Sequence, residues 1–90
     1  MDAASSWKDV FSRWPAEMLR RGVVVTAFSE QISFSGFSTG EAFLLVERQT
    51  PDAMGARTVV LPYDKILALK IVDVVKPRLF QSFGFETASV

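Results

Sequence analysis

Hydrophobic and polar residues alternate between residues 30 and 48 in a pattern that predicts two strands. Apolar side chains alternate with serines over residues 31–38, which is the period of a strand with one buried face. Residues 42–48 hold a bulky apolar run, as expected of a strand that lies against a core. Gly40 reverses the chain at little steric cost, and Gly36 marks a bend in the first strand of the pair. The pattern therefore predicts a bent antiparallel pair, which suits a small, strongly curved barrel.

A second periodicity, near the N-terminus, predicts an amphipathic helix over residues 6–21. Apolar side chains recur there at spacings of three, four and seven residues. They are Trp7, Val10, Phe11, Trp14 and Met18. Pro15 interrupts this stripe, so we expect either a kink or two short helices that meet beside it. Gly22 would end the helix, with Arg20 and Arg21 at its negative pole. Phosphate contact is the alternative role of the two arginines, and we favour the cap.

Three more segments have strand character, which completes a set of five. The β-branched residues 23–28 predict the first strand, and residues 58–61 and 65–72 predict the fourth and fifth. Proline and glycine make residues 49–56 a loop. Residues 77–90 form a tail that is rich in phenylalanine, and disordered segments are poor in aromatic residues. We therefore expect one domain, residues 1–90, whose tail packs on the barrel or on a neighbouring copy.

Composition adds a reason to expect self-association. The chain has 90 residues, of which 49% are hydrophobic, with eight Phe and two Trp. A chain this short buries a limited share of its surface, so part of the apolar surface would be covered by other copies. Ten basic and ten acidic residues cancel, so the overall basic charge of many nucleic-acid binders is missing.

Composition also excludes several kinds of chemistry. The chain has no Cys and no His, which removes disulfides, thiolate and imidazole catalysis and the usual zinc ligands. We expect no metal, no cofactor, no small-molecule substrate and no enzyme activity. We expect that the first residues are not a signal peptide, and no apolar run approaches the ~20 residues that span a bilayer. A cytoplasmic protein without a membrane partner is therefore the expectation.

One helix followed by five strands, with a long loop between the third and fourth strands, resembles the Sm/LSm family, including its bacterial Hfq branch. The resemblance covers about residues 22–72. Its segments are Val23-x-Val25, Phe34-Ser35-Gly36, Glu41-Ala42-Phe43-Leu44-Leu45-Val46 and Val60-Leu61-Pro62-Tyr63-Asp64-Lys65-Ile66. The resemblance implies a mostly β fold: an N-terminal α-helix, then a five-stranded, strongly bent Sm-like (SH3-like) small barrel. It also implies a homo-oligomeric ring that binds single-stranded RNA.

The RNA site that the resemblance implies lies at the turn between the fourth and fifth strands. The Arg-Gly of archaeal and eukaryotic Sm proteins and the Tyr-Lys-His of Hfq are both missing there. The turn offers Tyr63, whose ring would stack on a base, and Lys65, whose ammonium would attract phosphate. Phe43 would add a second stacking ring. The structural alternative is a barrel turn in which Tyr63 covers the core and Phe43 is a strand residue.

Two further groups of charged residues leave alternatives open. Glu41 and Asp64 would form a paired-carboxylate site if both turns lined one rim, and nothing in the sequence requires that proximity. Lys76 and Arg78 flank Pro77, and they form either a basic contact or a solvated turn.

The predicted contact between copies follows the fourth and fifth strands, because unpaired strand edges invite strand addition from a neighbour. A head-to-tail contact of this kind closes into a ring when the rotation is right. The predicted contact residues are Thr58, Val59, Val60, Leu61, Leu67, Leu69 and Ile71. Two functions follow. We rank an RNA-binding ring first by a narrow margin, and the alternative is a scaffold or protein-interaction module on the same barrel without nucleic acid. A single SH3-like barrel shares the same strand pattern.

Overall fold

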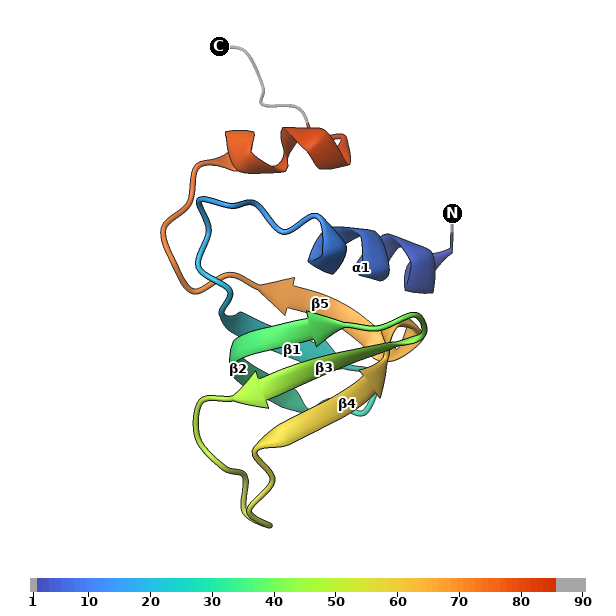
Figure 1. The fold of residues 1–90 in the computed structure, drawn as a ribbon, viewed down its shortest axis with the longest axis vertical. Helices are drawn as coiled ribbons and strands as arrows, with labels where there is room; N and C mark the ends of the chain where they lie inside the picture. The colour runs from blue at the N-terminus through green and yellow to red at the C-terminus, as the bar shows by residue number, and fades with distance from the viewer. Residues whose placement is uncertain (1, 86–90) are drawn as a thin grey trace.

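A computed structural model describes residues 2–85 as one helix, five strands and two short 3-10 helices. The elements are α1 (Ala3–Ser12), β1 (Gly22–Thr26), β2 (Gln31–Thr39), β3 (Phe43–Arg48), β4 (Thr58–Pro62), η1 (Tyr63–Lys65), β5 (Ile66–Lys70) and η2 (Pro77–Phe83). The strands form one antiparallel sheet in the order β4-β3-β2-β1-β5, and α1 lies across one end of it (Figure 1).

The sheet is curled and open. β4 and β5 lie at opposite edges, yet only the three residues of η1 join them, so the sheet bends until the two edges approach each other at this turn (Figure 1). The described residues form no β4–β5 ladder, so the mostly β fold is confirmed while the closed barrel is not. β2 is irregular where the sequence predicted a bend: its register against β3 shifts between Phe34 and Gly36. A Cβ at Gly36 would lie 2.6 Å from the Glu47 carboxylate, so a larger residue here would require the Glu47 side chain to move.

All five predicted strands are present, and each lies within two residues of its expected bounds. The predicted helix, residues 6–21, is wrong at both ends. It begins at Ala3 because Asp2 caps it, accepting a hydrogen bond from the Ser5 N–H at 2.8 Å. It ends at Ser12, ahead of Pro15, whose ring cannot continue a helix.

The apolar stripe continues past the helix without helical backbone. Met18 is buried, and the Trp14 indole N–H lies 3.1 Å from the Met18 carbonyl, which folds residues 14–18 into a turn. Gly22 begins β1 instead of capping a helix. Arg20 donates to the Phe37 carbonyl at 3.0 Å, and Arg21 pairs with Asp73. The predicted helix cap at residues 20–22 is therefore wrong.

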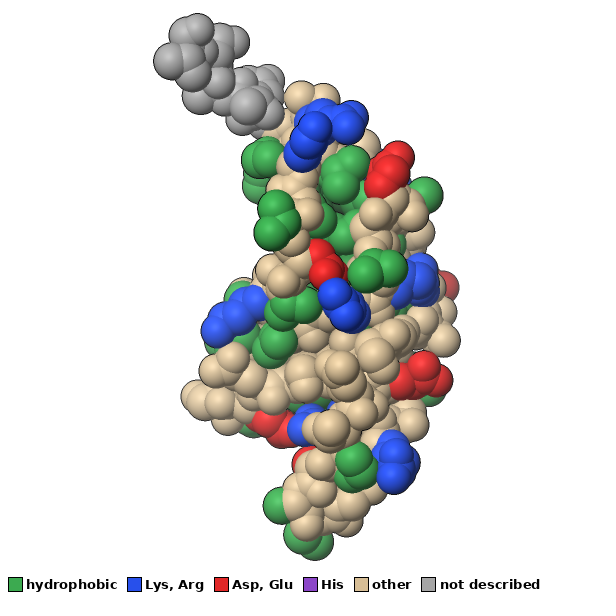
Figure 2. Space-filling view, turned by 90° about the vertical axis from the view of Figure 1, so that its left-hand side faces the viewer, with side chains coloured by type: hydrophobic (Ala, Val, Ile, Leu, Met, Phe, Trp, Pro, Cys, Tyr) green, Lys and Arg blue, Asp and Glu red, His purple; other side chains and the backbone are tan. Residues whose placement is uncertain are grey.

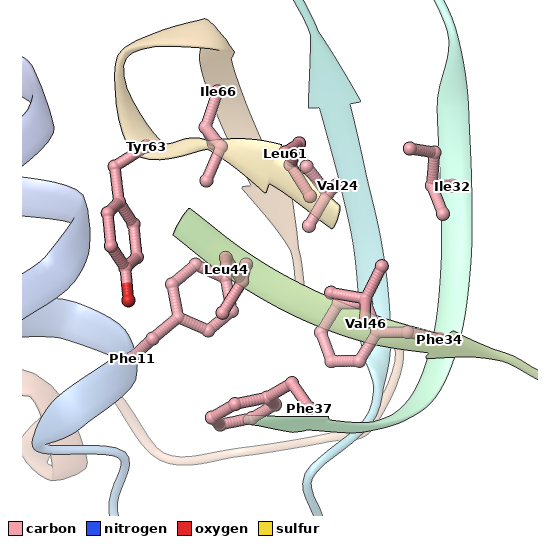
Figure 3. Close-up of a cluster of buried hydrophobic side chains, with 10 residues drawn as sticks. All are labelled: Phe11, Val24, Ile32, Phe34, Phe37, Leu44, Val46, Leu61, Tyr63 and Ile66. Atoms are coloured by element: carbon pink, nitrogen blue, oxygen red, sulfur yellow. The ribbon is translucent and has the colours of Figure 1, made fainter. Parts of the chain in front are cut away.

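The core lies between α1 and the curled face of the sheet (Figure 3). α1 contributes Phe11, which is 1% exposed. Each of the five strands contributes at least one buried side chain. The buried members are Phe11, Val24, Ile32, Phe34, Phe37, Leu44, Val46, Leu61, Tyr63 and Ile66. No buried side-chain nitrogen or oxygen atom among the described residues lacks a hydrogen-bond partner.

The C-terminal arm, residues 77–85, lies above α1 (Figure 1). Arg13 of the helix segment donates to the Ser82 carbonyl at 3.1 Å and lies over the Phe83 ring at 4.4 Å. Residues 77–85 of the Phe-rich tail therefore contact the chain at the end of α1. Packing of the tail on the barrel or on a neighbouring copy stays a prediction, and residues 86–90 fall outside the described part. Between residues 2 and 85, no helix is long and apolar enough to cross a membrane.

Candidate functional site

A cleft of about 570 Å³ opens between α1 and two turns of the sheet. One turn connects β2 to β3 and the other is η1 with the end of β4. The charged and aromatic residues that line it are Lys8, Glu41, Phe43, Tyr63, Asp64 and Lys65. The three residues that the sequence predicted as an RNA site therefore lie together. Lys8 was missed, because only the tertiary position of α1 brings it to these turns.

The two aromatic residues of the cleft differ in accessibility. Phe43 is 52% exposed at the start of β3, so its side chain is accessible to a ligand. Tyr63 is 2% exposed, and its hydroxyl donates to the Gly40 carbonyl at 3.0 Å. Burial raises the pKa of Tyr63, which keeps the phenol neutral. Tyr63 is therefore part of the core and of the cleft wall, and it presents no free ring face for stacking.

The charges of the cleft are balanced. Lys8 and Lys65 are cations, and Glu41 and Asp64 are anions. The Lys8 Nζ lies 3.0 Å from the Glu41 Oε1 in an ion pair at the rim, where the Glu41 side chain is 96% exposed. An exposed pair of this kind contributes little to stability, and it can open at little cost. Glu41 pairs with Lys8, so the two carboxylates do not form an isolated acid pair.

The edge of β4 presents free backbone groups. The Arg48 N–H donates to the Arg57 carbonyl at 2.7 Å, which sets the alternation of hydrogen bonds along the β3–β4 ladder. Counting from this pair, every second residue of β4 directs its backbone groups away from β3. These residues are Thr58, Val60 and Pro62. Because Pro62 has no N–H, its place on the outer side of an edge strand leaves the ladder intact.

The edge of β5 presents a similar set. The Thr26 N–H donates within the β1–β2 hairpin, so the backbone groups of its neighbour Val25 face β5, where they pair with Ala68. By alternation, Leu69 directs its N–H and C=O groups outward. Leu67 has no partner on β1, because the register shifts between Val25 and Thr26 at this point. β4 therefore offers outward backbone groups over three residues, and β5 offers them at Leu69.

The predicted contact residues divide by side-chain position. Val60 is 59% exposed and Leu67 is 65% exposed, so each edge carries one open apolar side chain. Leu61 is 6% exposed and belongs to the core, which removes its side chain from any contact between copies. Val59 and Leu69 pack against the core from the edges, and Thr58 is exposed. The remaining predicted residue, Ile71, follows β5 and lines a second depression.

This second depression is an apolar groove of about 460 Å³ between α1, the end of β5 and the C-terminal arm. Trp7 and Val10 come from the helix, and three phenylalanines come from the arm. Lys76 and Arg78, the basic residues beside Pro77, are exposed at the start of η2, and their role as a basic contact or a solvated turn stays open. No group of three or more acidic, His or Cys side chains that could hold a metal ion occurs within residues 2–85.

Comparison of the chain with protein-family models, curated proteins and solved structures finds no match.

Proposed function

We propose that the chain is a self-assembling, Sm-like module whose copies join head to tail, β4 of one copy against β5 of the next, in a closed ring. The observation that carries the proposal is the strand order. The two strands expected from the sequence to meet a neighbour are the two edges of an open sheet. A sheet with two different free edges is suited to a heterologous contact, and such contacts close into rings when the rotation fits.

Both edges have what strand addition needs. Their free backbone groups lie beside one exposed apolar side chain each, Val60 on β4 and Leu67 on β5. Charges on an edge are a common device against such pairing. β4 has no charged residue, and β5 has one, the exposed Lys70 at its last position. The proposed role is that of a scaffold, in which the ring presents the same surface many times.

Light scattering behind a sizing column tests the ring by its mass, and a charge exchange tests its geometry. The variants Val60→Lys and Leu67→Glu each place one unpaired charge in the proposed contact, so each should give monomers. The double variant should recover the assembly, because the ammonium introduced at position 60 of one copy would then face the carboxylate introduced at position 67 of the next. Ser38→Lys, an exposed position on the interior strand β2, is the matched control and should assemble as the wild type does. A monomeric wild type, or single variants that both assemble as the wild type does, would reject the proposal.

A second candidate function, binding of single-stranded RNA, is favoured by one observation. Phe43 and Lys65 line the same cleft, with Lys8 beside them. An accessible aromatic ring and two ammonium groups could hold a base and its phosphates. The two carboxylates at the same cleft oppose phosphate, which is why this function ranks below the scaffold.

Fluorescence anisotropy with a labelled single-stranded RNA of mixed sequence, at several salt concentrations, tests this second function. Binding at the cleft should weaken steeply as salt rises and should be lost in Phe43→Ala and Lys65→Glu. Lys70→Glu removes a cation outside the cleft, on β5, and should leave the affinity unchanged. Absence of binding at low salt, or equal losses in all three variants, would leave the scaffold as the proposed function.

A further inference from the structure

The chain that follows β5 carries exposed apolar side chains on one side. In residues 71–75, Ile71, Asp73 and Val75 are partly buried, whereas Val72 and Val74 are 60% and 105% exposed. This alternation continues the strand-like character of β5 beyond the end of its pairing with β1. Asp73 is held inward by Arg21, whose Nε lies 3.0 Å from the Asp73 carboxylate. The ion pair thus fixes which side of the segment faces solvent.

The loop of residues 49–57 offers a second exposed apolar side chain in a structured setting. Asp52 accepts hydrogen bonds from the backbone N–H groups of Met54 and Ala56, both at 2.9 Å, which closes a compact turn. Met54 stands at the tip of this turn and is 93% exposed. Hydrophobic side chains gather at this lower tip in Figure 2, where Figure 1 draws the loop. Methionine is flexible and polarisable, which suits it to contacts with irregular apolar surfaces.

Strand direction decides which parts of two neighbouring copies would meet. β4 runs toward η1 and β5 runs away from it, so the two edges point in roughly opposite directions (Figure 1). In a ring of more than four copies the rotation from one copy to the next is less than a right angle, so neighbouring edges still run in roughly opposite directions. The end of β5 in one copy therefore lies beside the start of β4 in the next. The residues that continue these ends are 71–75 and 49–57.

We propose that in the assembled protein Val72 and Val74 of one copy are covered by the loop of residues 49–57 of the next copy, with Met54 against the two valines. This proposal rests on the head-to-tail assembly proposed above and identifies a second part of that contact. The partner is a second copy of this chain, because the exposed residues continue the two edges directly. Val72, Val74 and Met54 are also all uncharged, apolar side chains. A contact among them would be driven by removal of their apolar surface from water.

The absence of native cysteine makes a crosslink the sharpest test. In the double variant Met54→Cys/Val74→Cys, oxidation should give a ladder of covalent oligomers on denaturing gels. Within one copy the loop and residues 71–75 lie well apart (Figure 1), so the ladder would report contacts between copies. Each single variant should give dimers at most, at low yield. As the matched control, Phe28→Cys/Val74→Cys combines the same change at position 74 with a cysteine at another exposed apolar position, and it should give no ladder.

A second variant measures the energetic part of the contact. Val72→Asp/Val74→Asp should raise the dissociation constant of the assembly by about tenfold or more, because two charges would be buried against the loop. Circular dichroism of the monomer should be unchanged, since both side chains are exposed. If the wild type assembles and the Val60/Leu67 charge exchange behaves as expected, yet no ladder forms and the dissociation constant does not change, this inference is overturned and the ring stands. If the wild type is monomeric, both are overturned.

Discussion

Two clusters of aromatic residues in this protein consist mainly of phenylalanine and reach very different degrees of burial. Phe11, Trp14, Phe34 and Phe37 pack together between the helix segment and the sheet. In this core cluster the rings of Phe11 and Phe37 meet edge to face, with centroids 5.1 Å apart. Phe37 is only 6% exposed.

The arm cluster, formed by Phe80, Phe83 and Phe85, is more loosely packed. Its ring centroids are 6.3 and 6.5 Å apart, and Phe85 is 64% exposed. The groove beneath the arm leaves one side of the cluster without protein contacts. Aromatic rings therefore form a core here only where the sheet provides a surface behind them.

Both clusters also carry an arginine on a phenylalanine. The Arg20 guanidinium lies 3.7 Å from the Phe37 ring centroid and donates to the Phe37 carbonyl. Arg13 lies 4.4 Å from the Phe83 centroid and donates to the neighbouring Ser82 carbonyl. Arg20 covers a ring that is already buried, whereas Arg13 links the arm to the end of α1. The two arginine–phenylalanine pairs thus have different structural roles.

Removal of one ring from each cluster gives the largest expected difference. Phe11→Ala should lower the free energy of unfolding by about 3–5 kcal/mol, because a buried ring leaves a cavity. Phe80→Ala should cost about 1 kcal/mol, since its surroundings are partly solvent. Urea denaturation followed by circular dichroism measures both. Phe11→Leu, expected to cost about 1–2 kcal/mol, keeps the comparison measurable if the alanine variant does not fold. Equal costs at positions 11 and 80 would contradict the difference between the clusters.

Tyr63, which extends the core cluster toward the cleft, should show a smaller effect that depends on pH. Tyr63→Phe keeps the ring and removes the hydrogen bond to Gly40, which should cost about 1 kcal/mol near neutral pH. Burial raises the pKa of Tyr63 in the folded state. The stabilisation is therefore complete below the ordinary tyrosine pKa of about 10 and falls as pH rises through the folded-state value.

Thermal melts between pH 8 and the alkaline limit of the assay check this sign. The wild type should lose stability above about pH 10, and Tyr63→Phe should lose less over the same range. Parallel curves for the two proteins would show that the phenol ionises equally in the folded and unfolded states.

The two arginines give the smallest expected effect, which is local. Arg13→Met should speed tryptic cleavage after Arg78 by about threefold, because loss of a cation–π contact lets the arm open more often. Arg20→Met should leave that rate unchanged. Mass spectrometry of the fragments separates cleavage after Arg78 from cleavage elsewhere. Equal rates in the wild type and Arg13→Met would mean that the arm is held by its phenylalanines alone.

Local sequence predicted most of the fold because strand alternation and glycine positions act over a few residues. The five strands, the irregularity at Gly36 and the η1 turn all follow from such short-range signals. The helix was extended too far because Met18 continues a helical spacing, although the tertiary contact that buries it forms on a turn. The spacing of apolar residues indicates which side chains are buried, but it does not by itself determine the backbone conformation between them.

The candidate cleft was only partly predictable for a related reason. Phe43, Tyr63 and Lys65 could be named because they flank turns that adjoin in the strand order, and the resemblance to a family pointed to those turns. Lys8 carries no local signal, because its place at the cleft depends on how α1 lies across the sheet. The burial of Tyr63 likewise depends on neighbours that are distant in sequence, such as Gly40.

The sequence by itself determined the strands, the glycine at the bend, the lack of cysteine and histidine chemistry, and the balance of charge, because each depends on residue type and nearest neighbours. The tertiary structure alone decided that the sheet stays open between β4 and β5, that Glu41 pairs with Lys8, and that Val72 and Val74 face solvent. These features depend on contacts between segments that are distant in sequence. Which side chains remain exposed is therefore decided only when the whole chain has packed.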